Sequence, residues 1–380
     1  MAGSARVVWL LLALNTAAAM EGDSCVTPHQ RMGSCVQLDT CRPLMMLLEG
    51  PRPLDPRAVD FLRRSQCGFV SRMPLVCCAQ PTTPSTTTPG QTAPLTDPLV
   101  DVTGDVKLRL LPLDICSPPA QNRIIGGNKT ALFEYPWMAL LAYDTWRGIQ
   151  FRCGGTVINK RYILTAAHCI TNLPPSQKLV GVRLGEHDMS KELDCVDDLE
   201  GQICAPPYQN FTIEEVIPHP QFSKSKLQND IGLIRLSRDA DFSTDSVKPI
   251  CLPIGEPQRE TLEGKKLIIT GWGATETGLA SDVLLWTTVA VVPLDKCAAI
   301  YQRAVPISEA QICAGGAARD SCGGDSGGPL MYVGDVDGEV RRMQFGVVSF
   351  GPKRCGTAGQ PGVYTRVGAY MDWILASMRP

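Results

Sequence analysis

The sequence predicts a mostly β-stranded protein, with an all-β domain of two sheets or barrels in residues 124–380 behind a small disulfide-rich module. Short apolar runs, among them "GVRLG", "IGLIRL", "KLIITGWG" and "FGVVSFG", alternate with Gly, Pro and Asp turns in this region. Six cysteines gather in residues 25–78, a stretch too short to rely on a hydrophobic core alone. Only the last residues, "AYMDWILASM", have apolar positions at helical spacing, which indicates one C-terminal helix.

Composition excludes two classes of partner. The chain of 380 residues has a formal net charge of -2, so it lacks the excess of positive charge that neutralises nucleic-acid phosphates. Its longest apolar runs fall short of the roughly 18 residues that a membrane-spanning helix needs. We therefore expect neither nucleic acid nor a membrane as a partner.

The N-terminal residues 1–19 are predicted to be a signal peptide, because Arg6 precedes an apolar run and Ala17 to Ala19 suit a signal peptidase. An uncleaved membrane anchor is the alternative, but the residues that flank the apolar run fit a cleaved signal peptide better. The sixteen cysteines, an even number, suit an oxidising extracellular compartment in which eight disulfides form. The sequons at Asn128 and Asn210 are candidate N-glycosylation sites.

Residues 20–78 are predicted to form a disulfide-stapled module. Its six cysteines allow 15 pairings, and the adjacent Cys77 and Cys78 should have different partners because joining them would strain the backbone. A metal site is the alternative, but no His spacing accompanies these cysteines. The Pro- and Thr-rich residues that follow, Ala79 to Leu99, cannot bury enough apolar surface to pack and are predicted to be an extended spacer within a linker of residues 79–123.

Ser326 is a candidate catalytic nucleophile, because the glycines around it permit a tight turn. Such a turn can expose the serine hydroxyl while neighbouring backbone N–H groups converge on one point. A serine nucleophile needs a base and a group that orients the base. His168 in "LTAAHC" is the best candidate base, since His29, His187 and His219 lie in predicted loops and are better explained as surface residues. Asp230, which opens the apolar run "IGLIRL", is the candidate orienting carboxylate.

In this order, "TAAHC", "NDIGLIRL" and "GDSGGPL" resemble the motifs of the chymotrypsin-like (trypsin-like) serine endopeptidases, and the resemblance extends from Ile124 to the C-terminus. It implies two six-stranded β-barrels with the site between them. It also implies that Ser326 is the nucleophile, that His168 is the general base and that Asp230 fixes the histidine tautomer. The backbone N–H groups of Gly324 and Ser326 would form the oxyanion hole.

The same resemblance implies a substrate preference and an activation step. Asp320, six residues before Ser326, matches the acid at the base of the S1 pocket, so Arg or Lys is expected before the scissile bond. Gly351 and Gly362 match the glycines that line this pocket. The segment "NRIIGG" resembles the activation site, where a trypsin-like protease would cleave after Arg123 and free the amino group of Ile124 to pair with Asp325. The uncut chain is thus predicted to be a zymogen.

The same resemblance also implies disulfide pairs and a metal site. The resemblance implies the pairs Cys116–Cys251, Cys153–Cys169, Cys297–Cys313 and Cys322–Cys355, and it leaves Cys195–Cys204 to close a loop of its own. The segment "LGEHDMSKELDC" resembles the calcium loop of some members, with Glu186, Asp188, Asp194 and the Lys191 carbonyl as candidate ligands of a structural calcium ion. A merely solvated acidic loop is the alternative.

The N-terminal module, with "CGF" at Cys67 and "PLVCC" at its end, resembles the clip domain of arthropod clip-domain serine proteases, with the pairs Cys25–Cys77, Cys35–Cys67 and Cys41–Cys78. This resemblance implies an enzyme secreted into haemolymph that cuts prophenoloxidase, a Spätzle-like precursor or a downstream clip protease. It also implies a trypsin-like activator and a serpin inhibitor. Two alternatives are a catalytically dead cofactor and a module whose clip surface does the main work, but the presence of His168, Asp230 and Ser326 favours an active enzyme.

Overall fold

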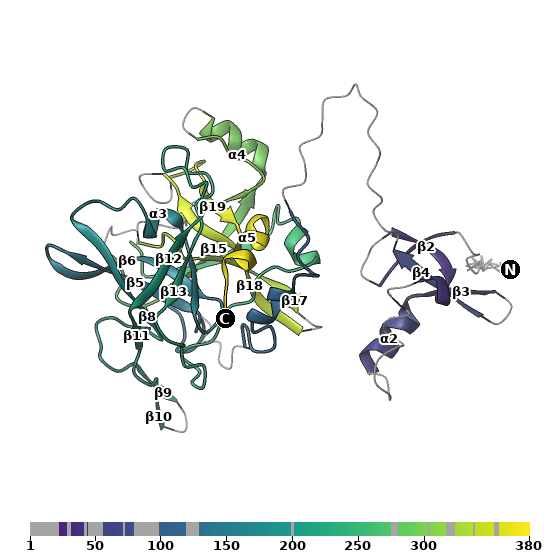
Figure 1. The fold of residues 1–380 in the computed structure, drawn as a ribbon, viewed down its shortest axis with the longest axis horizontal. Helices are drawn as coiled ribbons and strands as arrows, with labels where there is room; N and C mark the ends of the chain where they lie inside the picture. Colours follow the sequence, from purple (N-terminus) through teal and green to yellow (C-terminus); the bar gives the residue numbers. More distant parts are fainter. Residues whose placement is uncertain are drawn as a thin grey trace, which may run out of the picture. The chain divides into compact units, whose positions relative to one another are not determined.

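The structure is a computed structural model, and it divides into two compact units, residues 1–94 and 95–380 (Figure 1). It describes residues 23–28, 32–41, 44, 56–70, 73–79, 99–118, 129–198, 201–274, 280–302, 305–316, 324–336, 339–352 and 357–380. Some predictions lie outside the described residues and stay predictions: the signal peptide 1–19, Arg123 and Ile124, Asn128, Asp320, and the Cys322–Cys355 disulfide.

The N-terminal unit is a four-stranded antiparallel sheet in the order β1-β2-β4-β3. Its elements are β1 (Ser24–Val26), β2 (Met32–Gln37), η1 (Leu38–Thr40), α2 (Pro56–Arg64), β3 (Gln66–Val70) and β4 (Met73–Ala79). Three disulfides join these elements: Cys25–Cys77, Cys35–Cys67 and Cys41–Cys78. The buried cluster around Cys41, Leu44 and Val76 is small, so the covalent links supply constraint that so little apolar burial cannot.

The second unit begins with a seven-stranded antiparallel sheet in the order β11-β8-β5-β6-β7-β13-β12. Its strands are β5 (Met138–Thr145), β6 (Gly148–Val157), β7 (Tyr162–Thr165), β8 (Gln177–Leu184), β11 (Gln209–Phe211), β12 (Ile213–Pro218) and β13 (Gly232–Leu236). The strands β7 and β13 are buried along their whole length, which explains their continuous apolar runs. A separate hairpin, β9 (Cys195–Asp198) and β10 (Gly201–Cys204), is closed by the Cys195–Cys204 disulfide.

A closed barrel follows, in the order β14-β15-β16-β19-β18-β17. Its strands are β14 (Lys266–Gly271), β15 (Leu285–Val292), β16 (Gln311–Ala314), β17 (Pro329–Val336), β18 (Glu339–Phe350) and β19 (Gly362–Arg366). The disulfide Cys297–Cys313 joins helix α4 (Leu294–Tyr301) to β16. The 3-10 helix η3 (Glu256–Arg259) lies on the chain between the two sheets, and α3 (Ala167–Ile170) follows β7.

The chain ends in η4 (Val367–Tyr370) and α5 (Met371–Ser377). The expected helical spacing is borne out in α5, because Met371, Ile374 and Leu375 are buried on one face. Residues 99–118, part of the predicted linker, pack on this unit through η2 (Val106–Leu110). The Lys107 ammonium donates to the carbonyl oxygens of Ala376 and Met378 at 2.7 and 2.9 Å.

The all-β prediction is confirmed, with one difference of detail. Only the second sheet closes into a six-stranded barrel, whereas the first is a half-barrel of seven strands. The seventh strand arises because the short β11 pairs with the edge of β8. In the described part of the chain, no helix has the length and apolarity needed to cross a bilayer.

Candidate active site

His168 and Asp230 are brought together from two neighbouring strands of the half-barrel. His168 lies in α3, directly after β7, and Asp230 lies two residues before β13, which pairs with β7. Asp230 Oδ2 is 2.7 Å from His168 Nδ1, and Asp230 Oδ1 accepts the His168 backbone N–H at 2.9 Å. A carboxylate at Nδ1 favours the tautomer with its proton on that nitrogen, so Nε2 is left free to accept one.

Asp230 is fully buried, so its negative charge depends on hydrogen bonds for stability. The Ser349 hydroxyl donates to Asp230 Oδ2 at 2.5 Å, and the Thr365 hydroxyl donates to the Asp230 carbonyl at 2.7 Å. Both donors come from the closed barrel, on β18 and β19. Sequence reasoning missed these two residues, since nothing in the local sequence indicates that they reach Asp230.

Tyr370, in the C-terminal segment η4, contacts the residue that precedes Asp230. Its hydroxyl donates to Asn229 Oδ1 at 2.8 Å, and Asn229 has a left-handed backbone with φ of 53° directly before Asp230. Burial, together with the charge of Asp230, raises the pKa of Tyr370 to about 12. The phenol thus stays protonated and able to donate at any physiological pH.

Ser326 lies in a turn that two glycines make possible. Gly324 and Gly327 have φ of 106° and 80°, and a side chain on Gly327 would collide with Thr165 Oγ1 and the Gly154 carbonyl. The Gly154 N–H donates to the Ser326 carbonyl at 2.8 Å, which ties this turn to β6. Within the described residues, no hydrogen bond joins Ser326 Oγ to His168, and such bonds commonly tighten only with substrate.

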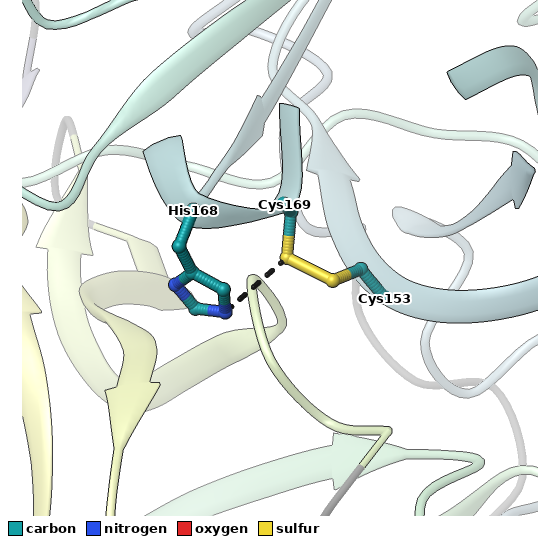
Figure 2. A group of neighbouring side chains, drawn as sticks. All are labelled: Cys153, His168 and Cys169. Carbon is teal, nitrogen blue, oxygen red and sulfur yellow. Dashed lines mark hydrogen bonds between the residues drawn. A yellow bond between two sulfur atoms is a disulfide. The ribbon is translucent and has the colours of Figure 1, made fainter. Parts of the chain in front are cut away.

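The disulfide Cys153–Cys169 joins β6 to α3 and so connects the serine anchor to the histidine. Figure 2 shows the His168 ring turning its Nε2 edge toward this disulfide, with Nε2 3.6 Å from Cys169 Sγ. The three side chains lie close enough together to suggest a metal site. We assign none, because both sulfurs are consumed by the disulfide and Nδ1 is already bonded to Asp230.

Asp325 points toward the end of β14. Its Oδ1 accepts the Gly273 N–H at 2.9 Å, and a side chain on Gly271 or Gly273 would collide with its carboxylate. The two glycines of "GWG" therefore form a cradle for the Asp325 carboxylate, which could not come this close if either position had a side chain. Its expected partner, the amino group of Ile124, lies outside the described residues.

The two glycines that were predicted to line the S1 pocket lie close together. Gly351 follows β18 and Gly362 begins β19, and a Cβ built on Gly351 would come within 3.7 Å of the Gly362 Cα. The two backbones are thus in contact range, and neither position adds a side chain to the space beside them. The acid expected at its base, Asp320, is outside the described part of the chain.

Comparison with known proteins gives the family. Residues 124–374 match the Trypsin family, and residues 25–78 match the regulatory CLIP domain of proteinases. The chain is 41% identical to Serine protease ea of Drosophila melanogaster, over 92% of this chain and 89% of that one. It is 38% identical to Phenoloxidase-activating factor 1 of Holotrichia diomphalia, over 98% of each chain. The crystal structure of the drosophila Grass clip serine protease of the Toll pathway matches with a TM-score of 0.66 and 33% identity, over 94% of this chain and 98% of that one. The chain belongs to the clip-domain serine proteases.

In this clip-domain protease the acidic loop before β9 is unusually buried. Glu186, Asp188 and Asp194 are 7%, 5% and 9% exposed. The His187 N–H donates to Glu186 Oε1 at 3.0 Å and to Asp194 Oδ2 at 3.1 Å, so these two carboxylates converge on one backbone group. Burial, followed by the charge of Asp194, raises the pKa of Glu186 although a hydrogen bond from Arg183 opposes the shift.

Two cations compensate part of this charge. Arg183 pairs with Glu186 at 3.0 Å, and Lys191 pairs with Asp188 at 3.0 Å. Although burial acts against it, hydrogen bonds from Ser190 and Lys191 lower the pKa of Asp188. Asp194 Oδ1 is buried and has no hydrogen-bond partner, so one oxygen of this carboxylate is left without a donor.

Three further predictions concern the Cys116–Cys251 disulfide, Asn210 and His219. The structure forms the disulfide Cys116–Cys251, and all the cysteines it describes are paired. Asn210 of the second sequon is exposed on β11, where its Oδ1 accepts from Arg183 Nε at 3.0 Å. His219, expected on the surface, is instead half-buried against the rings of Tyr370 and Trp373.

Proposed function

We propose that this clip-domain protease is a secreted zymogen that becomes a trypsin-like serine endopeptidase when it is cleaved after Arg123. The observation that most supports this proposal is the pair formed by His168 and the fully buried Asp230, 2.7 Å apart and beside the backbone anchor of Ser326. A buried carboxylate that orients a histidine next to a glycine-flanked serine is the arrangement that acyl transfer requires.

In the proposed mechanism, each of these groups acts once in the formation of the acyl-enzyme and once in its hydrolysis. His168 Nε2 takes the Ser326 hydroxyl proton as Oγ attacks the scissile carbonyl, and then protonates the leaving amine. Asp230 stabilises the imidazolium through the bond at Nδ1, while Ser349 and Thr365 hold the aspartate in place. The N–H groups of Gly324 and Ser326 would stabilise the oxyanion before water releases the acyl group.

Specificity and activation are assigned to residues around this centre. Asp320 would bind an Arg or Lys side chain that enters a pocket lined by Gly351 and Gly362. After cleavage, the ammonium of Ile124 would pair with Asp325, whose carboxylate already lies in the cradle of Gly271 and Gly273. The new pair would hold Gly324 and Ser326 in the geometry of an oxyanion hole.

The relatives suggest where such an enzyme acts. Their names refer to phenoloxidase activation and to the Toll pathway, so we propose protein substrates in a secreted, haemolymph cascade. The candidates are prophenoloxidase, a Spätzle-like precursor or a downstream clip protease. A trypsin-like protease would act upstream, since the activation bond follows Arg123, and a serpin would end the activity.

We also propose that the acidic loop holds a structural calcium ion through Glu186, Asp188, Asp194 and the Lys191 carbonyl. The buried Oδ1 of Asp194 supports this, because a buried carboxylate oxygen without a hydrogen-bond donor suits a hard cation. The ion would add positive charge to a loop in which ion pairs from Arg183 and Lys191 reach two of the three buried carboxylates.

The first test cleaves the purified zymogen after Arg123 with a trypsin-like protease and measures hydrolysis of matched peptides with Arg, Lys or Phe before the scissile bond. We expect activity only after cleavage, with the highest kcat/KM for Arg. The Ser326→Ala variant, cleaved in the same way, should lose about 10^6 in kcat. An Arg-selective activity retained by that variant would remove Ser326 from the mechanism, and an inactive but fully cleaved native chain would favour the cofactor hypothesis.

A further inference from the structure

His168 lies in a helix that is too short to hold its own position. The helix α3 forms a single turn, with hydrogen bonds from the Cys169 N–H to the Ala166 carbonyl at 3.1 Å and from the Thr171 N–H to the Ala167 carbonyl at 3.0 Å. One turn of helix is marginal by itself, because few hydrogen bonds offset the loss of backbone freedom. The position of His168 therefore depends on contacts with the rest of the fold.

Tyr143 supplies one of these contacts from β5. Its side chain is fully buried in the main core, and its hydroxyl donates to the carbonyl oxygen of Cys169, the residue after His168, at 2.7 Å. Carbonyl groups at the end of a helix have no partner in the helix itself, and within the described residues no backbone N–H donates to this one. The Tyr143 hydroxyl thus satisfies a buried acceptor that would otherwise lack a donor.

This hydroxyl remains a donor throughout the pH range in which the enzyme would act. Burial raises the pKa of Tyr143 above that of an exposed phenol, although the charge of Arg152 opposes the shift. The phenol therefore stays protonated at physiological pH. Its bond to Cys169 is a constant part of the folded structure.

The strands β5 and β6 together hold both reacting side chains. On β6, Cys153 forms the disulfide with Cys169. The next residue, Gly154, donates to the Ser326 carbonyl at 2.8 Å. Tyr143 holds the carbonyl of the same Cys169 from β5, which pairs with β6 along its length. The separation of nucleophile and base therefore depends on one pair of strands.

The disulfide and the tyrosine restrain different atoms of Cys169. The disulfide holds Sγ, the atom toward which His168 Nε2 turns (Figure 2), whereas the Tyr143 hydroxyl holds the backbone carbonyl. The His168 side chain is 24% exposed, so packing does not enclose its ring. Because a misplacement of about 1 Å can reduce a catalysed rate roughly a hundredfold, the backbone restraint matters for proton transfer.

We propose that Tyr143 is a positioning residue, whose hydroxyl holds the Cys169 carbonyl so that His168 Nε2 reaches the Ser326 hydroxyl when substrate binds. This inference rests on the proposed endopeptidase activity. Tyr143 is fully buried, so it touches neither substrate nor the reacting atoms. The glycines expected to line the S1 pocket belong to the other barrel. The contribution of Tyr143 should therefore appear in kcat and not in substrate binding.

The test compares the activated native protein with Tyr143→Phe, which keeps the buried ring and removes only the hydroxyl. With a peptide that carries Arg before the scissile bond, we expect kcat to fall roughly three- to tenfold, less than a misplacement of about 1 Å can cause. KM and the inhibition constant of benzamidine, a cation that imitates the Arg side chain, should stay within about twofold of the native values. An unchanged kcat, or a rise in KM alone, would overturn the proposal.

Tyr162→Phe is the matched control. Tyr162 is also fully buried, on β7 of the same sheet, and its hydroxyl accepts from Arg235 Nη1 at 3.1 Å and from the Arg379 N–H at 3.0 Å. Both variants should lower the thermal midpoint, since each leaves a buried polar group without its partner, but Tyr162→Phe should keep the native kcat. An equal loss of kcat in the two variants would show a general loosening of the sheet and would contradict a specific role for Tyr143.

A spectroscopic measurement separates this inference from the proposed catalysis. In cleaved Ser326→Ala protein, the proton on His168 Nδ1 that is bonded to Asp230 is expected to give a far-downfield NMR signal, which His168→Gln identifies by removing it. Tyr143→Phe should broaden this signal through faster exchange with water, whereas Tyr162→Phe should not. That result would support the positioning role even if no peptide were hydrolysed. An unchanged signal in Tyr143→Phe would refute it even in a fully active protease.

Discussion

The pH dependence of folding stability depends on individual titratable residues, and His219 is the clearest example. Its Nδ1 accepts the Gln221 N–H at 3.2 Å, and its ring contacts Tyr370 and Trp373 at 5.3 and 5.1 Å between centroids. Burial lowers its pKa below the ordinary 6.5, although the nearby Asp372 acts in the opposite direction. The folded protein therefore holds this histidine neutral, whereas the unfolded chain protonates it as the pH falls.

Stability should thus decrease with acidification through His219. A depressed histidine pKa makes the unfolded state bind more protons below about pH 6.5, so the stabilisation present at pH 7.5 is lost as the pH falls toward the folded pKa. We expect the native protein to lose more of its thermal midpoint than His219→Asn between pH 7.5 and 5.5. Parallel pH profiles of the two proteins, measured by scanning calorimetry, would contradict this assignment.

At the scale of elements, the acidic loop and the β9–β10 hairpin combine a disulfide with a concentration of buried negative charge. The Ala205 N–H donates to the Asp194 carbonyl at 2.8 Å, so the end of the hairpin also fixes the backbone of the proposed calcium loop. Within this element Arg183 pairs with Glu186 and Lys191 pairs with Asp188. Calcium would stabilise this element further rather than create it.

Calcium removal should accordingly lower stability without unfolding the protein. Binding at a free calcium concentration a hundred times the Kd adds about 2.7 kcal/mol to the free energy of unfolding. We expect EDTA to lower the thermal midpoint and added calcium to restore it in the native protein and in Asp295→Asn, a change at an exposed acid on α4. Asp194→Asn should not respond to calcium; a response equal to that of the native protein would place the ion elsewhere.

At the scale of the whole molecule, the proposed cleavage after Arg123 would leave the N-terminal part attached in two ways. The disulfide Cys116–Cys251 is one, and the packing of residues 99–118 on the catalytic unit is the other. Val102 and Leu111 are buried in the main core, and Arg341 donates to the carbonyl oxygens of Leu113, Asp114 and Cys116. This second contact was not expected from a segment classed as linker.

Removing the disulfide should therefore not separate the two fragments under native conditions. The double variant Cys116→Ser, Cys251→Ser, cleaved after Arg123, should run as two fragments on a non-reducing denaturing gel, because no covalent link remains. On native size exclusion the fragments should still co-elute, since buried apolar contacts and the bonds from Lys107 persist. Elution of the small fragment by itself would show that the packing of residues 99–118 contributes little.

The sequence predicted the parts of this molecule that depend on neighbouring residues. His168, Asp230 and Ser326 stand in recognisable motifs, and the periodicity of α5 indicates its buried face. What it could not predict are contacts between distant segments. Ser349 and Thr365 lie more than 100 residues from Asp230, His219 becomes half-buried only because η4 and α5 pack against it, and the pairing of β11 with β8 has no local signature.

The hydrogen bonds around Asp230 have a consequence for inhibitor design. The aspartate belongs to the half-barrel, whereas Ser349 and Thr365 belong to the closed barrel, so its position depends on how the two halves are aligned. A compound that wedged into their interface and shifted one half would disturb His168 without occupying the substrate cleft. Such a compound need not resemble an arginine peptide, and it could therefore discriminate among enzymes that share the same S1 preference.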